Sequence, residues 1–467
     1  MKPVLLIDFG STYTKITAVD VESETVLGTA RGITTVTTDI TQGLNEALEQ
    51  LFLQTGKLEF GRVLGCSSAA GGLKMVAVGL VPELTAEAAK RAALGAGAKV
   101  LGVFCHELSE YEVADIKALQ PDIILLAGGT DGGNKQVILH NAHMLSQLGL
   151  DVPFVVAGNK SVTPAVVRIL SETMSEVVYA ENVMPRLNEL NIESARQMIR
   201  SIFLKKIVEA KGLHKANKLV DRMVMPTPAA VLKAAELISR GSAGEPGLGD
   251  IIVVDIGGAT TDIYSIAKGD PTQSSVTLHG LPEPEAKRTV EGDLGMRYSA
   301  APLVKAARAA AIARWAGTEE QTVIDYAAKV EANIEYLPQT PEEEQVEIAM
   351  ARACTALGID RHTGYLETYF TPFGTAYSQV GKDLTEVKTV IGTGGVIINN
   401  RYPASVLQGV VFDEANPQVL KPRNPEYRID ESYIMAAMGL LGEEYPDTAV
   451  RMMKKYIVGG NKRGTEK

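Results

Sequence analysis

The sequence predicts an α/β protein of two or three structural units. The length of 467 residues sets the expected number of units. Between about residues 81 and 180, short apolar runs alternate with segments of helical periodicity, which is typical of parallel strands joined by helices. In addition, residues 6–15 (LIDFGSTYTK) and 253–262 (VVDIGGATTD) repeat one pattern of strand, aspartate, glycine turn, hydroxyl residues and second strand.

The N-terminal segment predicts a hairpin broken by glycine. Residues 4–9 and 14–21 are apolar and β-branched runs on either side of Gly10, and residues 25–30 form a third run. Leucines recur at helical spacing further on, so we expect a helix over residues 41–54.

The alternating block predicts helices and strands in regular succession. Ser109 is a candidate N-cap, because Glu112 stands at the spacing of a capping box. The expected strands are apolar throughout, so we expect a parallel sheet that helices cover on both faces. The expected helices span residues 85–95, 109–119, 134–148 and 163–173, and the strands span 100–105, 123–127 and 152–157.

The remainder of the chain predicts a second set of strands and helices. Prolines stand near the start of one expected helix, where a missing N–H group costs little. Residues 241–249 are rich in Ser, Gly and Pro and predict a linker. Strands are expected at residues 251–255, 261–266 and 388–391, and helical segments at 192–218, 225–238, 302–347 and 430–441.

Composition excludes several classes of protein. The formal net charge is −10, which argues against a general binder of nucleic acid or of anionic membranes. Cys66, Cys105 and Cys354 are far apart, so a disulfide framework, a zinc site and an iron–sulfur site are not expected. No apolar stretch approaches the roughly 20 residues of a membrane span, and the first apolar run is too short for a signal peptide. We therefore expect a cytoplasmic protein.

Both copies of the repeated motif offer a site for phosphate. Each ends a strand in Asp-x-Gly, followed by small residues whose N–H groups can point at an anion. Two such turns facing each other could hold the phosphates of a nucleotide, and Asp8 and Asp255 could hold Mg²⁺ through its waters. Alone, either turn is better explained as a plain β-hairpin with a small loop. The matching second copy changes this balance and favours phosphate binding.

These motifs resemble the actin, Hsp70 and sugar-kinase superfamily of ATPases. Residues 8–13 and 255–262 resemble its two phosphate loops, and residues 392–395 (GTGG) resemble its adenosine loop. Residues 226–231 and 430–439 resemble its two connecting helices. The resemblance implies an actin-like, ribonuclease H-like fold of two lobes around Mg-ATP. It places one lobe at residues 1–245 with an inserted α/β block at about 81–185, the second lobe at 246–428, and a connecting helix with a basic tail at 429–467.

The same resemblance implies the site residues. Asp255, or less favourably Asp262, would orient the attacking water or accept its proton, and Asp8 would position Mg²⁺. Met225 stands where Hsp70-type chaperones carry a hydrolytic glutamate, so that group is absent here. Lys15 could reach a phosphate, but a lysine on the surface of a strand is about as well supported. Glu291 and Asp293 could line the nucleotide cleft, but a solvated acidic turn is about as well supported. Contacts to ATP are expected from Gly10, Ser11, Thr12, Tyr13, Lys15, Gly257, Gly258, Thr260, Thr261, Glu291, Gly292, Gly392, Gly394 and Gly395.

Within the superfamily, the chain resembles the GlmL/MutL-like accessory ATPases of coenzyme B12-dependent glutamate (methylaspartate) mutase. Residues 8–15, 126–133 and 289–295 carry this resemblance. It implies a slow ATPase that acts as a reactivating chaperone on a mutase subunit, without nucleic acid or membrane partners and with a homodimer as one arrangement. The inserted block is the candidate docking site for the client.

Two other functions remain open from the sequence. A small-molecule kinase would need a hydroxyl pocket beside the γ-phosphate, and an actin-like filament protein would need complementary ends. The glycine-rich residues 126–133 fit an anion site or a tight turn between strand and helix. His362 lies in a run that only superficially resembles a cobalamin signature, so we expect no cobalt ligation there.

Overall fold

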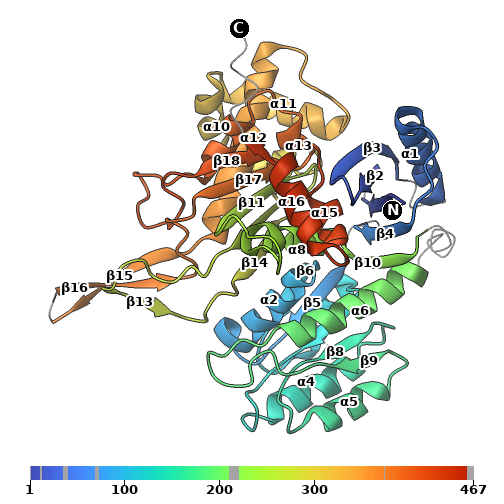
Figure 1. The fold of residues 1–467 in the computed structure, drawn as a ribbon. Helices are drawn as coiled ribbons and strands as arrows, with labels where there is room; N and C mark the ends of the chain where they lie inside the picture. The colour runs from blue at the N-terminus through green and yellow to red at the C-terminus, as the bar shows by residue number, and fades with distance from the viewer. Residues whose placement is uncertain are drawn as a thin grey trace. The chain divides into compact units, whose positions relative to one another are not determined.

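The computed structural model describes residues 2–10, 13–34, 40–68, 73–209, 220–372 and 374–459, and it divides into two compact units. Unit 1 comprises residues 1–234, 280–282 and 436–449, and unit 2 comprises residues 235–279, 283–435 and 450–467. Figure 1 follows the chain through both units by colour. None of the helices in the described ranges combines the length and apolar character that crossing a membrane requires.

Unit 1 begins with a five-stranded mixed sheet in the order β10-β4-β1-β2-β3. The neighbours β1–β2 and β2–β3 are antiparallel, whereas β1–β4 and β4–β10 are parallel. Helix α1 (Ile40–Thr55) buries Leu44 and Leu51 in the same core as Ile7 and Ile16. The strands are β1 (Val4–Phe9), β2 (Tyr13–Asp20), β3 (Thr25–Ile33), β4 (Arg62–Ser67) and β10 (Arg222–Pro226).

Unit 1 also contains the predicted parallel block, whose strand order is β6-β5-β7-β8-β9. Neighbouring residues of β7 face two different cores: Ile123 and Leu125 belong to one, Ile124 and Leu126 to the other. Helices cover both faces, as the apolar runs predict. The strands are β5 (Lys74–Val78), β6 (Lys99–Phe104), β7 (Ile123–Leu126), β8 (Phe154–Val156) and β9 (Val177–Tyr179). The helices are α2 (Glu87–Gly95), α3 (Glu110–Leu119), α4 (Gln136–Ser146), α5 (Thr163–Ser171) and α6 (Glu193–Glu209), with a π-helical turn at Pro82–Ala86.

Unit 2 contains a six-stranded mixed sheet in the order β14-β12-β11-β17-β18-β19. Its strands are β11 (Ile251–Ile256), β12 (Thr261–Ile266), β14 (Ala286–Glu291), β17 (Thr389–Thr393), β18 (Glu426–Ile429) and β19 (Val458–Gly459). Its helices are α9 (Ala300–Ala307), α10 (Ala309–Ala316), α11 (Glu320–Ala332), α12 (Pro341–His362), α13 (Gly395–Ile398) and α14 (Pro403–Leu407), followed by a 3₁₀ turn at Gln408–Val410. Helices α9 to α12 share a core with β11 and β12.

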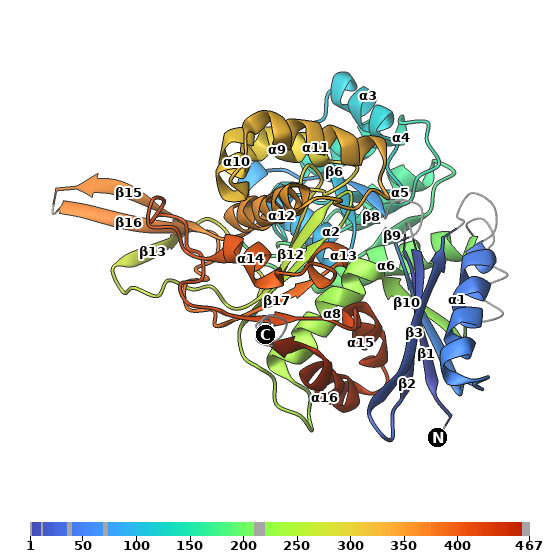
Figure 2. The ribbon, with the colours of Figure 1, turned by 90° about the horizontal axis from the view of Figure 1, so that it is seen from above.

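A smaller sheet in unit 2 joins β13 (Val276–His279), β16 (Gly374–Val380) and β15 (Tyr365–Thr371) in that order. Figures 1 and 2 show the β15–β16 hairpin extending outward from the rest of unit 2. The sequence analysis does not predict this sheet. Most residues of β15 are exposed, so the strand lacks the buried apolar face that periodicity detects.

The main sheets of the two units have the same topology. In unit 1, β1 pairs antiparallel with β2 and parallel with β4. In unit 2, β11 pairs antiparallel with β12 and parallel with β17. A third antiparallel strand follows on one side and a further parallel strand on the other side of both sheets. The predicted fold class, an α/β protein with one mixed sheet in each lobe, is therefore confirmed.

Three helices contribute residues to both units: α8 (Thr227–Arg240), α15 (Met435–Leu441) and α16 (Pro446–Tyr456). Two predicted helix starts need correction. Residues 225 and 226 belong to β10, so α8 begins at Thr227. Helix α15 begins at Met435 and not at Asp430, because the buried Asp430 carboxylate accepts hydrogen bonds from the N–H groups of Ile434 (2.9 Å) and Met435 (3.0 Å).

Candidate nucleotide-binding turns

The turn between β1 and β2 is closed by Gly10. The N–H of Gly10 donates to the carbonyl oxygen of Tyr13 at 3.1 Å. A Cβ atom at position 10 would lie 2.6 Å from that oxygen, so only glycine fits without a shift. The Tyr13 ring lies under the guanidinium of Arg31, 4.9 Å from its centroid. Ser11 and Thr12, which the resemblance assigns to ATP, lie outside the described residues.

Asp8 lies two residues before Gly10, in register with Lys15 on β2 and Cys66 on β4. Its Oδ1 accepts a hydrogen bond from the Thr227 hydroxyl at 2.5 Å and one from the Cys66 thiol at 3.6 Å. Burial raises the pKa of the Cys66 thiol well above its usual value, and the Asp8 charge adds to this effect. Cys66 is therefore a neutral donor to Asp8 and not a nucleophile.

The turn between β11 and β12 repeats this construction in unit 2. The N–H of Gly257 donates to the carbonyl oxygen of Thr260 at 2.9 Å, as Gly10 does to Tyr13. Asp255 again lies two residues before the closing glycine. It stands in register with Asp262 on the antiparallel neighbour and with Thr393 on the parallel one. The sequence repeat therefore corresponds to two hairpins with the same closing bond and the same placement of an aspartate.

Asp262 is held by a buried arginine. Arg288 donates from Nε to Asp262 Oδ1 at 2.8 Å, and its Nη2 lies 2.6 Å from the same oxygen. The Thr260 hydroxyl donates to Asp262 Oδ2 at 3.3 Å. Both partners of the ion pair are largely buried, with side-chain exposures of 4% for Arg288 and 14% for Asp262. These bonds make Asp262 a structural group in this arrangement.

The hydroxyl of Thr261 is also engaged inside the protein. Thr261 is fully buried, and its Oγ1 donates to the carbonyl oxygen of Leu294 at 2.5 Å. The structure thus places Thr261 between the hairpin and the following acidic turn, with its side chain turned away from solvent.

The acidic turn after β14 packs against the β11–β12 hairpin. The N–H groups of Met296 and Arg297 donate to the carbonyl oxygens of Gly257 (3.1 Å) and Gly258 (2.8 Å). The Ser299 hydroxyl links Ala259 and Gly292 by donating to both carbonyl oxygens, at 2.9 and 3.0 Å. The acidic turn therefore lies against the β11–β12 hairpin and supports it.

The two carboxylates of the acidic turn are both paired with Arg361, at the end of α12. Arg361 Nη1 lies 2.7 Å from Glu291 Oε2 and 2.7 Å from Asp293 Oδ1. The hydrogen bonds from Arg361 lower the pKa of Asp293, and in return raise the pKa of Arg361. If Glu291 contacted a nucleotide directly, its carboxylate would have to do so while it is also bonded to Arg361.

The three glycines at the end of β17 differ in how much space a side chain would have at each position. A Cβ atom on Gly392 would lie 2.8 Å from the Ile397 side chain. Gly394 has a φ of +88°, and its Cβ atom would lie 2.4 Å from Asp255 Oδ1. Gly395 is exposed, and the nearest heavy atom to its Cβ position is 3.9 Å away. Contacts within the protein thus require glycine at 392 and 394, whereas position 395 has open space.

This difference predicts opposite results for two neighbouring substitutions. Gly395→Val is expected to leave the thermal unfolding of the protein near wild type and to weaken ATP binding, if the loop approaches a nucleotide. Gly394→Ala is expected to displace the Asp255 carboxylate and to lower stability even without a nucleotide. Calorimetric ATP titration and thermal unfolding of both variants test this. Wild-type ATP affinity in Gly395→Val would show that no nucleotide approaches this loop.

Sequence reasoning missed two residues of this region. Thr227 stood inside the quoted motif at residues 226–231, but only the fold brings its hydroxyl to Asp8. Arg288 had no local signal, because it lies 26 residues beyond the Asp262 that it pairs with. The pairing of β12 with β14 brings Arg288 close to Asp262. This register is set only when the sheet assembles, so the sequence contains no local sign of it.

The glycine-rich residues 126–133 form a rigid turn in unit 1. Asn159 is fully buried, accepts from the Gly132 N–H at 3.1 Å and donates to the carbonyl oxygens of Gly133 and Asn134. Asn182 donates to the Gly129 carbonyl oxygen at 3.0 Å and to Asp131 Oδ1 at 2.9 Å. These bonds explain the turn without a ligand.

The duplicated sheet and its two aspartate-bearing hairpins define the class of this protein, the actin-like α/β fold. Within that class, the chain belongs to the MutL protein family, whose model matches residues 4–457. It is 54% identical over 461 residues to Protein MutL of Clostridium tetanomorphum, covering 98% of this chain and 100% of the relative. The family predicted from the sequence motifs is confirmed.

Solved structures of other proteins align with nearly the whole chain at 10% identity. Component A of (R)-2-hydroxyglutaryl-CoA dehydratase from Acidaminococcus fermentans covers 98% of this chain and 99% of its own, with a TM-score of 0.29. Xylulose kinase from Bifidobacterium adolescentis covers 98% and 94%, with a TM-score of 0.31. A glycerol dehydratase reactivase covers 94% and 99%, with a TM-score of 0.29. Superpositions this weak support no conclusion about function.

Proposed function

We propose that this protein is a Mg-dependent ATPase that reactivates an adenosylcobalamin-dependent mutase of the glutamate (methylaspartate) type. The observation that carries the ATPase part is the duplicated hairpin, with Asp8 and Asp255 each two residues before a glycine that closes the turn. Membership of the MutL family supports the reactivase part, together with the motif resemblance to mutase accessory ATPases.

The residues at both turns fit Mg-ATP chemically. Carboxylate and hydroxyl oxygens are the ligands that Mg²⁺ prefers, and it commonly uses only one or two protein carboxylates beside phosphate oxygens. Bound Mg-ATP would supply the anhydride to be cleaved and the cation that balances its phosphate charge. We propose Asp8 and Asp255 as the residues that hold the hydrated ion.

Asp255 is the group that we propose to orient the attacking water and to accept its proton. The backbone of Gly394 lies so close to Asp255 Oδ1 that no Cβ atom fits between them, and this contact restricts the carboxylate. Asp262 accepts hydrogen bonds from Arg288 and Thr260, which hold its carboxylate in place. Positioning and charge stabilisation account for most of the catalysis of phosphoryl transfer, and this arrangement supplies positioning.

We propose that ATP hydrolysis acts on the client protein through a conformational change of this protein. Helices α8, α15 and α16 each carry residues of both units, so we propose them as the elements that adjust when the nucleotide changes. Thr227, the first residue of α8, donates directly to Asp8. A movement of the Asp8 carboxylate would therefore act on α8 through this one hydrogen bond, and the later residues of α8 belong to unit 2.

A reactivation assay tests the proposed function. A glutamate mutase inactivated with hydroxocobalamin is incubated with this protein, Mg-ATP and fresh coenzyme, and its activity is followed. We expect activity to return with ATP and not with a non-hydrolysable analogue, because release of the damaged cofactor would use the shape change. Pull-down of the mutase in each nucleotide state gives an independent readout. If the protein hydrolyses ATP but neither binds nor revives the mutase, the client is wrong and the ATPase proposal stands.

A further inference from the structure

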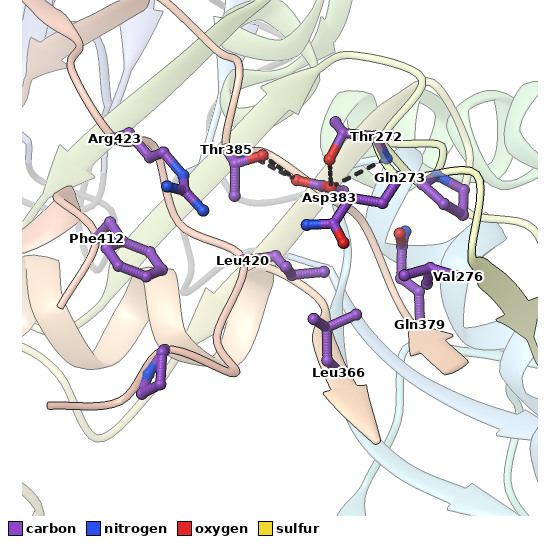
Figure 3. A pocket seen from close by; sticks show the side chains of 12 residues that line it. Thr272, Gln273, Val276, Leu366, Gln379, Asp383, Thr385, Phe412, Leu420 and Arg423 are labelled. Carbon is purple, nitrogen blue, oxygen red and sulfur yellow. Dashed lines mark hydrogen bonds between the residues drawn. The ribbon is translucent and has the colours of Figure 1, made fainter. Parts of the chain in front are cut away.

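A pocket of about 150 Å³ lies in unit 2, at the inner end of the three-stranded sheet, and its lining includes no residue of either aspartate hairpin. Figure 3 shows it from close by, with Phe412 and Arg423 on one side and Val276 and Gln379 on the other. Loops 271–276, 379–385 and 412–423 all contribute to it. The proposed ATPase and reactivase functions make no use of this pocket.

The first indication of a ligand is a buried amide without its full set of partners. Gln379 is fully buried and lines the pocket. Its Nε2 donates to the carbonyl oxygens of Gly269 (2.7 Å) and Gly381 (2.8 Å), which fixes the orientation of the amide. Its Oε1 then has no hydrogen-bond donor among the described residues. A buried acceptor without a donor costs free energy, and a ligand that donates a hydrogen bond here would remove this cost.

The second indication is the guanidinium group of Arg423, which forms no ion pair with a carboxylate among the described residues. Arg423 lines the pocket and lies 4.8 Å from the centre of the Phe412 ring, which holds its planar group in place. In the parts of the chain that the structure describes, no carboxylate pairs with Arg423. Arginine held in this way presents a planar fork of donors that suits a carboxylate.

The pocket also contains one anion whose oxygens are already occupied. Asp383 Oδ1 accepts from the N–H and hydroxyl of Thr385, at 2.9 and 2.5 Å. Its Oδ2 accepts from the N–H and hydroxyl of Thr272, at 3.3 and 2.8 Å. Asp383 is therefore fixed, but it still contributes a negative charge, which favours a cationic group nearby. The pocket thus contains one positive group, Arg423, and one negative group, Asp383. A zwitterionic ligand carries the two complementary charges.

The remaining wall is apolar. Val276, Leu366 and Leu420 line the pocket beside Phe412, together with two prolines. Pockets that bind small molecules combine such apolar walls with a few fixed polar groups that set the orientation of the ligand. A volume of about 150 Å³ is enough for a compound of amino-acid size.

We propose that this pocket binds a free α-amino acid with an aliphatic side chain. The carboxylate of the amino acid pairs with Arg423, and its ammonium group donates to Gln379 Oε1 on the side where Asp383 carries negative charge. The aliphatic side chain packs against Val276, Leu420 and Phe412.

Ligand-observed NMR on the full chain tests this proposal. The probes are L-valine, L-leucine, L-isoleucine and L-methionine, with 4-methylpentanoate and 3-methylbutylamine as analogues of leucine that lack the ammonium or the carboxylate. We expect at least one amino acid to show saturation transfer, and both analogues to bind about tenfold more weakly or not at all. Absence of binding by all four amino acids, or equal binding of 4-methylpentanoate, would overturn the proposal.

Two variants and one control locate the site. Arg423→Gln removes the cation from an exposed position, and it is expected to abolish the signal while the fold persists. Gln379→Met removes the orphan acceptor together with two hydrogen bonds, so its folding is checked first by circular dichroism. The control is Arg401→Gln, because Arg401 also lies over an aromatic ring, that of Tyr402, but does not line the pocket. An unchanged signal in Arg423→Gln would show that the amino acid binds elsewhere.

Discussion

Asp255→Asn is expected to lower ATP hydrolysis by about 10²–10⁴-fold, the usual contribution of a positioned proton acceptor. Asparagine keeps the shape of the side chain, so it fits against the backbone of Gly394 as aspartate does. It cannot accept the proton of the attacking water. We therefore expect thermal unfolding to stay near wild type, and Mg-ATP affinity to fall much less than the rate of hydrolysis, because Asp8 remains to hold the hydrated ion. Steady-state phosphate release, with ATP affinity measured separately by calorimetry, distinguishes the two effects.

The matched control for this substitution is Asp270→Asn, an exposed aspartate in the same unit. It should hydrolyse ATP at the wild-type rate. A wild-type rate in Asp255→Asn as well would remove the β11–β12 hairpin from the proposed mechanism. The same variant in the reactivation assay should bind the mutase and fail to revive it.

Arg288→Met is expected to destabilise unit 2 by about 3–5 kcal/mol, the range for breaking a buried ion pair on one side. Asp262 would keep its charge in a largely buried position and lose both contacts from the guanidinium. Arg288 also lies 5.9 Å from the centre of the buried Tyr264 ring, so its packing contributes. Because the chain has two units, the unfolding of unit 2 is best followed by hydrogen exchange of β12 and β14.

The double variant Asp262→Leu with Arg288→Met is the control. Replacing both charges with apolar side chains removes the uncompensated carboxylate, so most of the lost stability should return. If the double variant is less stable than Arg288→Met alone, the ion pair is not the source of the effect. Neither outcome depends on whether the protein hydrolyses ATP.

Local pattern predicted most of the described helices, but it missed many of the described strands, including the buried β4 and β5. The apolar runs of the inserted block gave their strands because every residue of β7 is buried, and continuous burial leaves a continuous apolar run. Ser109 caps α3 with the capping box that its spacing to Glu112 predicts. In contrast, β13, β15 and β16 went unpredicted because their largely exposed residues carry no such run.

The candidate site was predictable in part. The repeated Asp-x-Gly pattern identified both hairpins, because a glycine that closes a tight turn and an aspartate before it are adjacent in sequence. The roles within the site depend on partners far along the chain. Asp262 pairs with Arg288, which lies 26 residues further along the chain. In the same way, Gly394 and Gly395 look alike, yet only Gly394 lies against Asp255.

By itself, the sequence determined the α/β class, the duplicated hairpin and membership of the MutL family, since periodicity, turn residues and motifs are local properties of the chain. Only the tertiary structure decided that Arg288 holds Asp262 by an ion pair, that Thr227 donates to Asp8, and that Gln379 and Arg423 line one pocket. Each of these facts joins residues separated by 26 to 219 positions. Such contacts exist only after strand register and packing have brought the segments together, and no local pattern encodes them.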